Sequence, residues 1–522
     1  MPDKFPRRLA NLTLLGAACA LSACGGLPKN GDRMPSSAMT GNGRTRLAVA
    51  VRPDVAAHPG KSGLHPLADG RDALAARLAL ADAAQRSLDV QYYIWHKDMA
   101  GEVLMERLFR AADRGVRVRL LLDDLGTMPS DATLLAIDSH PNVEVRMFNP
   151  VALRSPRLVG VIADFSRINR RMHNKSFTAD GQVAIVGGRN IGNEYFAASE
   201  VANFADLDVA MIGPVVNEVS ADFDLYWNHQ AAIPIAALSR QNTTPEEFAA
   251  KRARLSERHD TAAHSDYAAS VRDSGFARQL RKGAVSYSWG RAVMLSDHPD
   301  KVLTSAATTD THLAPKLREV VAATDRELFL VSPYFVPGKQ GVALLAAVRQ
   351  RGVRVVVITN SLASTDGIPV HAGYQRYRKP LLEAGVELYE MKPTAGASRG
   401  RRSGGLRGSS GGSSAASLHG KTFAFDRKIG FIGSYNLDPR SSKLNTEMGV
   451  LFDIPELAAR LPATLERRID HDAYRLELAD GHLVWVTREG DTEVRYHSEP
   501  GASHWKRFKV GVLSLLPIEG LL

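Results

Sequence analysis

The sequence predicts an α/β fold made of two tandem domains, each a mixed β-sheet flanked by helices. Two observations lead to this fold class. A short polar motif occurs twice in register, and strand-like and helix-like segments alternate in the same order in both halves. The chain of 522 residues is also too long for one ordinary domain. A pseudo-twofold axis between the two domains would bring the two motifs to one shared cleft.

The repeated motif combines histidine, lysine, aspartate and asparagine. Its first copy contains His173, Lys175, Asp180 and Asn190, and its second copy contains His419, Lys421, Asp426 and Asn436. All four shared positions are separated by the same number of residues. A single H-x-K-x4-D pattern would be weak evidence, but two copies in register, each followed by an apolar run and a glycine, indicate a duplicated domain.

The predicted elements repeat in order around these motifs. Apolar residues at helical spacing predict helices over 72–86, 101–114 and 341–351, while residues 87–95, 116–122, 327–331 and 353–359 have strand composition. The segment Arg-Gly-Val-Arg-Val occurs identically at 114–118 and 351–355, and its glycine is placed to end the preceding helix. Strands that alternate with helices favour an α/β layer structure in each half.

The N-terminus has the pattern of an export signal. Basic residues precede a short apolar stretch that ends in Leu21-Ser22-Ala23-Cys24, which resembles the bacterial lipobox. Residues 1–23 are therefore predicted to be a lipoprotein signal peptide, and Cys24 the lipidated residue. An ordinary signal peptide with an incidental cysteine is the alternative. We expect a membrane-anchored lipoprotein on the periplasmic side of a bacterial envelope membrane, without a transmembrane helix.

Composition divides the remaining chain. We predict a flexible tether (24–62), a first domain (63–241), a helical connector (242–300), a second domain (301–460) and a C-terminal segment (461–522). Residues 394–417 form a low-complexity Gly/Ser insertion with several arginines, either a basic lid over anionic head groups or an insertion without a role. Basic and aromatic residues near the C-terminus suit docking at a membrane interface or a helix that closes over the core, and the second interpretation is favoured.

The motif residues suit chemistry at a phosphodiester. One histidine can attack phosphorus, and the second can protonate the leaving alkoxide. Lys175 and Lys421 supply fixed positive charge for the phosphoryl oxygens, and Asn190 and Asn436 add neutral donors. This scheme needs no metal and no cofactor. Asp123 and Asp124 could form a metal pair, but a turn at the end of a strand is the favoured interpretation.

A catalytic histidine needs an acceptor for its other ring nitrogen, and a carboxylate serves best. Glu447 follows His419 in the second half and is predicted to orient that ring. Asp206, with Asp208 as an alternative, is predicted to orient His173. The net charge of +10 makes an anionic partner plausible.

The paired motifs resemble the HKD motifs of the phospholipase D superfamily, over nearly all of the chain from about residue 62. Residues 87–95, 417–421, 433–441 and 444–449 are similar to the bacterial cardiolipin synthases, particularly type C. The resemblance implies a phosphatidyl group carried on one histidine and passed to an alcohol. It assigns the nucleophile to His173 and the acid/base role to His419. Asp180 and Asp426 are expected to hold the motifs together rather than touch substrate.

Phospholipids are the expected partners: phosphatidylglycerol, with phosphatidylethanolamine as an alternative donor. Three other functions stay open: a hydrolytic phospholipase D, a phosphodiesterase acting on nucleic acid, and a lipoprotein that only binds phospholipid. The sequence shows no nucleic-acid-reading module, and a lipid anchor favours membrane substrates. The oligomeric state is not determined by the sequence.

Overall fold

The computed structural model describes residues 27–28, 33–39, 43–154, 156–239, 244–305, 309, 311–395, 415–516 and 519–521. The first half contains strands β1 (Ser62–Leu67), β2 (Ser87–Tyr92), β3 (Arg117–Asp123), β4 (Val143–Phe148), β5 (Ser176–Ala179), β6 (Val183–Gly187), β7 (Ala202–Ala205), β8 (Asp208–Ile212) and β9 (Ala232–Pro234). Its helices are α2 (Arg46–Ala57), α3 (Gly70–Ala83), α4 (Met99–Asp113), α5 (Asp131–Asp138), α6 (Arg157–Ala163), α7 (Phe165–Ile168), η2 (Asn193–Tyr195), α8 (Val215–Trp227) and α9 (Ile235–Leu238).

Helices α10 (Pro245–Ala263), α11 (Asp266–Arg272) and α12 (Gly275–Arg281) lead to the second half. Its strands are β10 (Ser288–Ser296), β11 (Glu327–Val331), β12 (Arg354–Asn360), β13 (Glu387–Met391), β14 (Ala415–Leu418), β15 (Lys421–Phe425), β16 (Ile429–Gly433), β17 (Met448–Asp453), β18 (Ala473–Ala479), β19 (His482–Glu489) and β20 (Thr492–Tyr496). Its helices are η3 (Pro299–Val302), α13 (Leu313–Ala322), α14 (Gly338–Gln350), α15 (Ile368–Gln375), α16 (Arg378–Glu383), α17 (Pro439–Lys443), α18 (Pro455–Glu466), α19 (Ile469–Asp472), α20 (His504–Ser514) and η5 (Glu519–Leu521).

Local sequence explains where these elements begin and end. Asp69 and Asp98 accept backbone N–H bonds as N-caps of α3 and α4. Gly115 and Gly352 follow α4 and α14 with φ of +89° and +87°, a conformation that glycine adopts without strain. The strands of the predicted core are buried along their whole length, as β2 shows, because helices cover both faces of the sheet.

The strands join into one mixed sheet that runs through both halves. Its hydrogen-bonded order is β9-β4-β3-β2-β5-β6-β8-β1-β10-β17-β16-β15-β11-β12-β13-β18-β19-β20, and β7 pairs separately with β14. The order from β1 to β4 repeats from β10 to β13 with the same parallel and antiparallel pairings. The antiparallel junction of the equivalent strands β1 and β10 is the arrangement that a twofold axis produces. The predicted fold class is confirmed.

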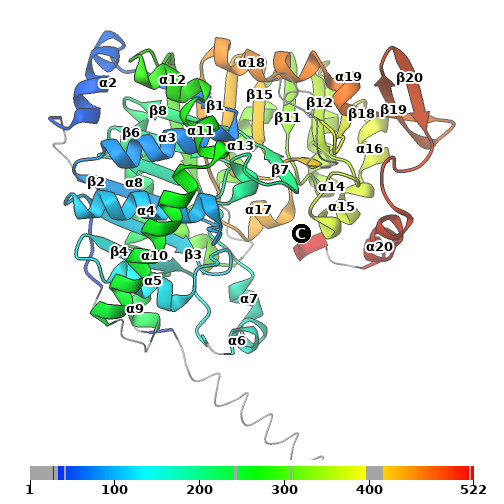
Figure 1. Ribbon diagram of the computed structural model, residues 1–522. Coiled ribbons are helices and arrows are strands. Elements are labelled where there is room, and N and C mark those ends of the chain that lie inside the picture. Colours follow the sequence, from blue (N-terminus) through cyan, green and yellow to red (C-terminus); the bar gives the residue numbers. More distant parts are fainter. Residues whose placement is uncertain are drawn as a thin grey trace, which may run out of the picture.

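The two halves lie side by side in Figure 1. Each has its own hydrophobic core, and a third core joins them. In the first half α3 and α4 cover one face of the sheet, while α8 covers the other. The shared core packs apolar residues of β6 and β8 against those of β16 and β17, for example Val186, Val209, Ile432 and Val450. This buried contact fixes the two halves relative to each other, and with them the ends of the strands that carry the two motifs.

Two predicted segments contain more of the sheet than expected. The prediction of a purely helical connector over 242–300 is wrong at its end, because β10 joins the sheets there. The predicted C-terminal segment is also not separate: β18 pairs with β13, and β19 and β20 extend the same sheet. Strands β10 and β18 pair with strands that are far away in the sequence, and local composition does not reveal such pairing.

The expectation of an unstructured tether over 24–62 is also wrong for the described residues. Residues 46–57 form α2, whose N-cap Thr45 accepts a bond from the N–H of Ala48. Arg33 donates to backbone oxygens at the end of α8, and Ala38 N–H donates to Asp224 at 2.7 Å. Tertiary hydrogen bonds therefore order a segment whose composition alone favours a coil.

Candidate active site

The two motif histidines lie where the halves meet. His173 and Lys175 immediately precede β5, and His419 immediately precedes β15. The N–H of His173 donates to the carbonyl of Thr446 at 2.9 Å, and the N–H of His419 donates to the carbonyl of Ala205 at 2.8 Å. Each histidine is thus fixed by the backbone of the other half.

These backbone contacts bring each histidine to a carboxylate of the other half. His173 Nδ1 lies 2.8 Å from Glu447 Oε2, and His419 Nδ1 lies 2.5 Å from Asp206 Oδ2. The predicted pairing, Glu447 with His419 and Asp206 with His173, is therefore wrong. Both carboxylates orient a histidine, but each serves the histidine of the other domain. The backbone bonds to Thr446 and Ala205 place His173 beside Glu447 and His419 beside Asp206.

Glu447 is held by a network that leaves it little freedom. Its Oε2 accepts the Ser434 hydroxyl at 2.5 Å, and its Oε1 accepts the Ser441 hydroxyl at 2.8 Å. Its own N–H donates to Asp297 at 2.8 Å. Burial raises the pKa of Glu447 to about 7, against the opposing effect of Lys175. The carboxylate that orients His173 therefore gains its charge near neutral pH.

Asp206 has the opposite electrostatic balance. Burial by itself would raise its pKa, but His419 and Lys421 outweigh burial and lower the pKa below the usual range. Asp206 is therefore anionic throughout the neutral range. An anion at 2.5 Å stabilises the protonated form of the His419 ring, which favours an acid role for that residue.

Two buried lysines add positive charge at the same place. Lys175 Nζ donates to the carbonyl of His173 at 2.6 Å, and Lys421 Nζ donates to that of His419 at 2.5 Å. Burial lowers the pKa of Lys175 to about 7 and that of Lys421 to about 8. An anionic phosphodiester would restore the charge of both ammonium groups, so this site favours an anionic ligand.

The surroundings lower the pKa of both histidines. Burial, followed by Lys175, lowers the pKa of His173 well below its usual value, and burial, followed by Lys421, lowers that of His419. A neutral His173 that donates Nδ1–H to Glu447 leaves the Nε2 lone pair free for attack. A ring held in this way has the chemistry that a nucleophile at phosphorus requires near neutral pH.

The asparagines differ in their partners. Asn190 donates from Nδ2 to the Tyr195 hydroxyl at 2.9 Å and accepts from the N–H of Ile94 at 3.2 Å. Asn436 is buried, and within the described part of the chain its Oδ1 has no hydrogen-bond partner. A buried amide with spare capacity beside the motif is suited to bind a polar ligand.

Asp180 and Asp426 lie at the far ends of β5 and β15 from the histidines. Asp180 accepts the N–H groups of residues 85–87, and Asp426 accepts those of residues 325–327. Both adopt positive φ, +53° and +54°. They hold the entry to the neighbouring strands β2 and β11, which agrees with the structural role expected for them and places them outside the reacting centre.

Comparison with known proteins matches this architecture. The family model "Cardiolipin synthase, PLD-like domain" matches twice, over residues 78–227 and 317–469. Cardiolipin synthase C of Escherichia coli is 46% identical over 479 residues, covering 91% of this chain and all of that protein. The chain belongs to the cardiolipin synthase family of phospholipase D-like proteins. The resemblance seen in the sequence is thereby confirmed.

Other relatives of this family member are more distant. Cardiolipin synthase B of Shigella flexneri is 26% identical, with 70% of this chain and 71% of that protein covered. The crystal structure of phosphatidylserine synthase from Haemophilus influenzae aligns with a TM-score of 0.55 at 14% identity, over 91% of this chain and all of that one. This last likeness concerns the fold alone.

Aromatic side chains around the histidines were not predicted as site residues. Tyr93 meets the His173 ring edge-on at 4.9 Å between centroids, and Phe204 stacks on His419 at 5.1 Å. Tyr195 also contacts His419, at 5.2 Å. The position of Tyr93 directly after β2, and that of Phe204 two residues before Asp206, are the signals that could have identified them.

Several residues singled out in the sequence have structural partners instead. Asp123 pairs with Arg171 at 3.1 Å, and Asp124 pairs with Arg154 at 2.7 Å, so the favoured strand-end interpretation holds. Cys24 and most of the insertion lie outside the described residues; only 394–395 and 415–417 are described, and β14 begins at Ala415. No described helix has the length and apolar character needed to cross a membrane.

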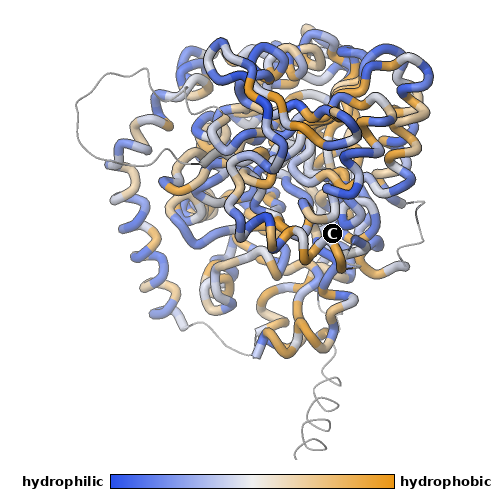
Figure 2. The backbone as a smooth tube through the Cα atoms, turned by 90° about the vertical axis from the view of Figure 1, so that its right-hand side faces the viewer, coloured by the Kyte–Doolittle hydropathy of each residue, from blue (hydrophilic) through white to orange (hydrophobic). Residues whose placement is uncertain are grey.

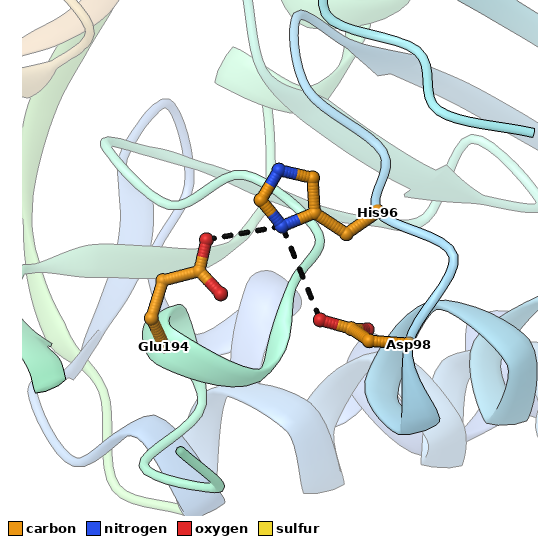
Figure 3. A group of neighbouring side chains, drawn as sticks. All are labelled: His96, Asp98 and Glu194. Carbon is orange, nitrogen blue, oxygen red and sulfur yellow. Dashed lines mark ion pairs between the residues drawn. The ribbon is translucent and has the colours of Figure 1, made fainter. Parts of the chain in front are cut away.

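One group of metal-ligand residues lies near the site in the described part of the chain: His96, Asp98 and Glu194 (Figure 3). His96 Nδ1 lies 3.1 Å from Glu194 and 4.0 Å from Asp98. Asp98 already accepts the N–H groups of Gly101 and Asn193. The bond to Glu194 raises the pKa of His96, so an ion pair next to a helix cap accounts for the group.

Proposed function

We propose that this protein is a phosphatidyltransferase that makes cardiolipin from phosphatidylglycerol through a phosphohistidine intermediate. The observation that carries the proposal is the crossed pair of histidine–carboxylate contacts, His173 with Glu447 and His419 with Asp206, beside two buried lysines. The name of the E. coli relative, cardiolipin synthase C, supports the same reaction.

The first half-reaction forms the covalent intermediate. Nε2 of His173 attacks the phosphorus of one phosphatidylglycerol while Glu447 holds Nδ1–H and stabilises the charge that develops on the ring. The P–O bond to the head-group glycerol breaks. The negative charge of the bound phosphodiester offsets the effect of Lys421, so His419, paired with Asp206, carries a proton in the complex. It gives this proton to the departing oxygen, so free glycerol leaves and the phosphatidyl group stays on His173.

The second half-reaction uses the same groups in reverse. His419, now neutral, takes the proton from a head-group hydroxyl of a second phosphatidylglycerol. That oxygen attacks phosphorus, and the P–N bond to His173 breaks. Lys175 and Lys421 supply positive charge and N–H donors to the phosphoryl oxygens in both steps, where charge builds up in the transition state. Asn436 would add a neutral donor only through its Nδ2, because its unpartnered Oδ1 is an acceptor.

Two parts of the proposal concern location and donor lipid. Family membership indicates association with a membrane. A lipid on Cys24 at the periplasmic face would keep the site beside bilayer phospholipids, and phosphatidylethanolamine would replace the first phosphatidylglycerol as donor if its head group leaves instead of glycerol. Attack by water in the second half-reaction would give phosphatidic acid and describes the hydrolytic alternative.

The deciding experiment is thin-layer analysis of labelled phosphatidylglycerol, with and without phosphatidylethanolamine, incubated with detergent-solubilised full-length protein. His419→Ala is the test variant, and His482→Ala, which removes an exposed histidine on β19, is the matched control. Cardiolipin formed by wild type and control but not by His419→Ala supports the proposal. Phosphatidic acid as the only product would make the enzyme a phospholipase, and no lipid product from wild type would contradict the proposal altogether.

A further inference from the structure

Two short segments expose large apolar side chains in groups. The α6–α7 patch consists of Leu158, Val159, Ile162 and Phe165, and the α20 patch consists of Trp505, Phe508, Val512, Leu515 and Leu516. Leu158 is 70% exposed, Ile162 68%, Trp505 63% and Leu515 84%. Single exposed apolar residues are normal on a protein surface, but grouped ones mark interaction surfaces.

The exposure follows from helical spacing. In the α6–α7 patch the apolar residues recur at three or four positions, while Gly160 and Ile168 of the same segment are buried. In α20, Trp505, Phe508 and Val512 lie on one side, and Val510 packs on Leu362 and Ala372. Each helix is therefore attached to the protein by one face and presents a second apolar face outward.

The charges beside both patches are mainly basic. Residues 504–516 contain Lys506, Arg507 and Lys509 and no acidic residue. Lys509 is exposed, with its ammonium 5.2 Å from the Trp505 ring centre. Residues 156–170 contain Arg157, Arg167 and Arg170 against the single acid Asp164; Arg157 also pairs with Asp124 and Arg167 with Asp164, so the α6–α7 patch carries less free positive charge than the α20 patch. Apolar faces edged by basic residues fit the boundary between acyl chains and anionic head groups.

Both patches are attached to the segments that build the active site. The segment with α6 and α7 runs directly into His173, and its Asn169 accepts from Arg440, a residue whose charge helps to lower the pKa of His173. Lys506 of α20 donates to the carbonyls of Ala363 and Thr365 at 3.3 and 3.1 Å.

The loop held by Lys506 continues to Asp366, whose negative charge partly opposes the lowering of the pKa of His419 by burial. One patch is thus connected to each histidine. In Figure 1 α6 and α7 lie at the bottom of the molecule and α20 at its lower right, all away from α12 and α18. Figure 2 colours the lowest helical turns as hydrophobic.

We propose that the α6–α7 patch and the α20 patch together dock the catalytic body on a bilayer that carries anionic phospholipid. The apolar side chains enter the interface between head groups and acyl chains, and the basic residues contact phosphates. Docking through two patches that are both connected to segments of the site sets the orientation in which a substrate head group reaches the two histidines. The inference rests on the proposed lipid substrate only in its kinetic consequence.

Local probes on the full chain test the docking directly. The two natural cysteines, Cys19 and Cys24, are replaced by serine, and a single cysteine carrying an environment-sensitive fluorophore is placed by Ile162→Cys, Leu515→Cys or, as the matched control, Leu280→Cys. Leu280 is 44% exposed on α12, at the opposite side of the molecule. We expect vesicles of phosphatidylglycerol to shift the emission of the first two probes to the blue, with little change at Leu280.

Two results would overturn the docking surface. Equal emission at all three positions with and without vesicles would show that neither patch enters the bilayer. A blue shift that appears without vesicles and grows with protein concentration would show that a second copy of the chain covers the patches. Replacing phosphatidylglycerol by phosphatidylcholine should weaken the response several-fold, because the basic residues then lose their anionic partners.

A kinetic comparison separates this inference from the proposed reaction. We expect Ile162→Glu combined with Leu515→Glu to lower the rate on vesicle substrate at least tenfold, and to leave the rate on a short-chain, monomeric phosphatidylglycerol within twofold of wild type. Leu280→Glu should change neither rate. Equal loss on both substrates would contradict docking, whereas inactive wild type on both substrates with an intact probe response would refute only the proposed reaction.

Discussion

The crossed pairing predicts that a change of Glu447 impairs the reaction at His173 rather than at His419. Glu447→Gln keeps the shape of the side chain but replaces the anion that accepts Nδ1–H of His173 at 2.8 Å. A hydrogen bond to a charged acceptor contributes about 1.5–3 kcal/mol, and a neutral one about 1 kcal/mol. The loss of about 0.5–2 kcal/mol on the developing imidazolium corresponds to roughly a 2–30-fold lower rate of phosphohistidine formation.

The assay uses a phosphatidyl ester of p-nitrophenol. This leaving group departs without a proton, so the acid role of His419 is not needed in the first half-reaction. We expect the burst of p-nitrophenol to be slow in Glu447→Gln and absent in His173→Ala. The burst should be close to wild type in Asp206→Asn and His419→Ala, which are then blocked at the second half-reaction.

The opposite pattern would refute the reasoning. If Glu447→Gln kept a fast burst while Asp206→Asn lost it, the carboxylates would act on the histidines of their own domains. Ser441→Ala serves as a milder companion, because it removes only the 2.8 Å bond to Glu447 Oε1. It should slow the burst less than Glu447→Gln does.

Three further predictions concern pH and stability. The profile of kcat/KM should be bell-shaped with its maximum near pH 7, because Glu447 loses its charge below about 7, whereas Lys175 and Lys421 lose their protons above about 7 and about 8; a flat profile from pH 5.5 to 9 would contradict these assignments. Asp180→Ala should lower the free energy of unfolding by about 3 kcal/mol, since three backbone N–H groups lose their acceptor, while kcat at low temperature stays within twofold; an unchanged melting temperature would count against this role. Burial raises the pKa of Asp222 from 3.8 to about 7, so its folded state holds a proton that the unfolded chain has lost, and stability falls as pH rises between these values. Asp222→Asn should therefore stabilise the protein by up to about 4 kcal/mol at pH 8 and by little near pH 4, as measured by denaturant unfolding, and equal effects at both pH values would be inconsistent with this cause.

The duplicated fold and the central chemistry could be predicted from the sequence because they depend on local and periodic features. Strand and helix composition repeats in both halves, and each motif is followed by an apolar run that forms a strand, β6 or β16. The role of Asp180 was accessible for a related reason. It follows a short strand, and a carboxylate there can accept the N–H groups at the start of the neighbouring strand.

The sequence by itself therefore determined the α/β class, the two-domain organisation and the residue types of the site. Only the tertiary structure decided which carboxylate serves which histidine. That pairing depends on backbone bonds between segments more than 200 residues apart, such as His173 to Thr446. The strand β10 and the ordered helix α2 were decided in the same way, by partners far along the chain, because hydrogen bonding and burial between distant segments outweigh local propensity.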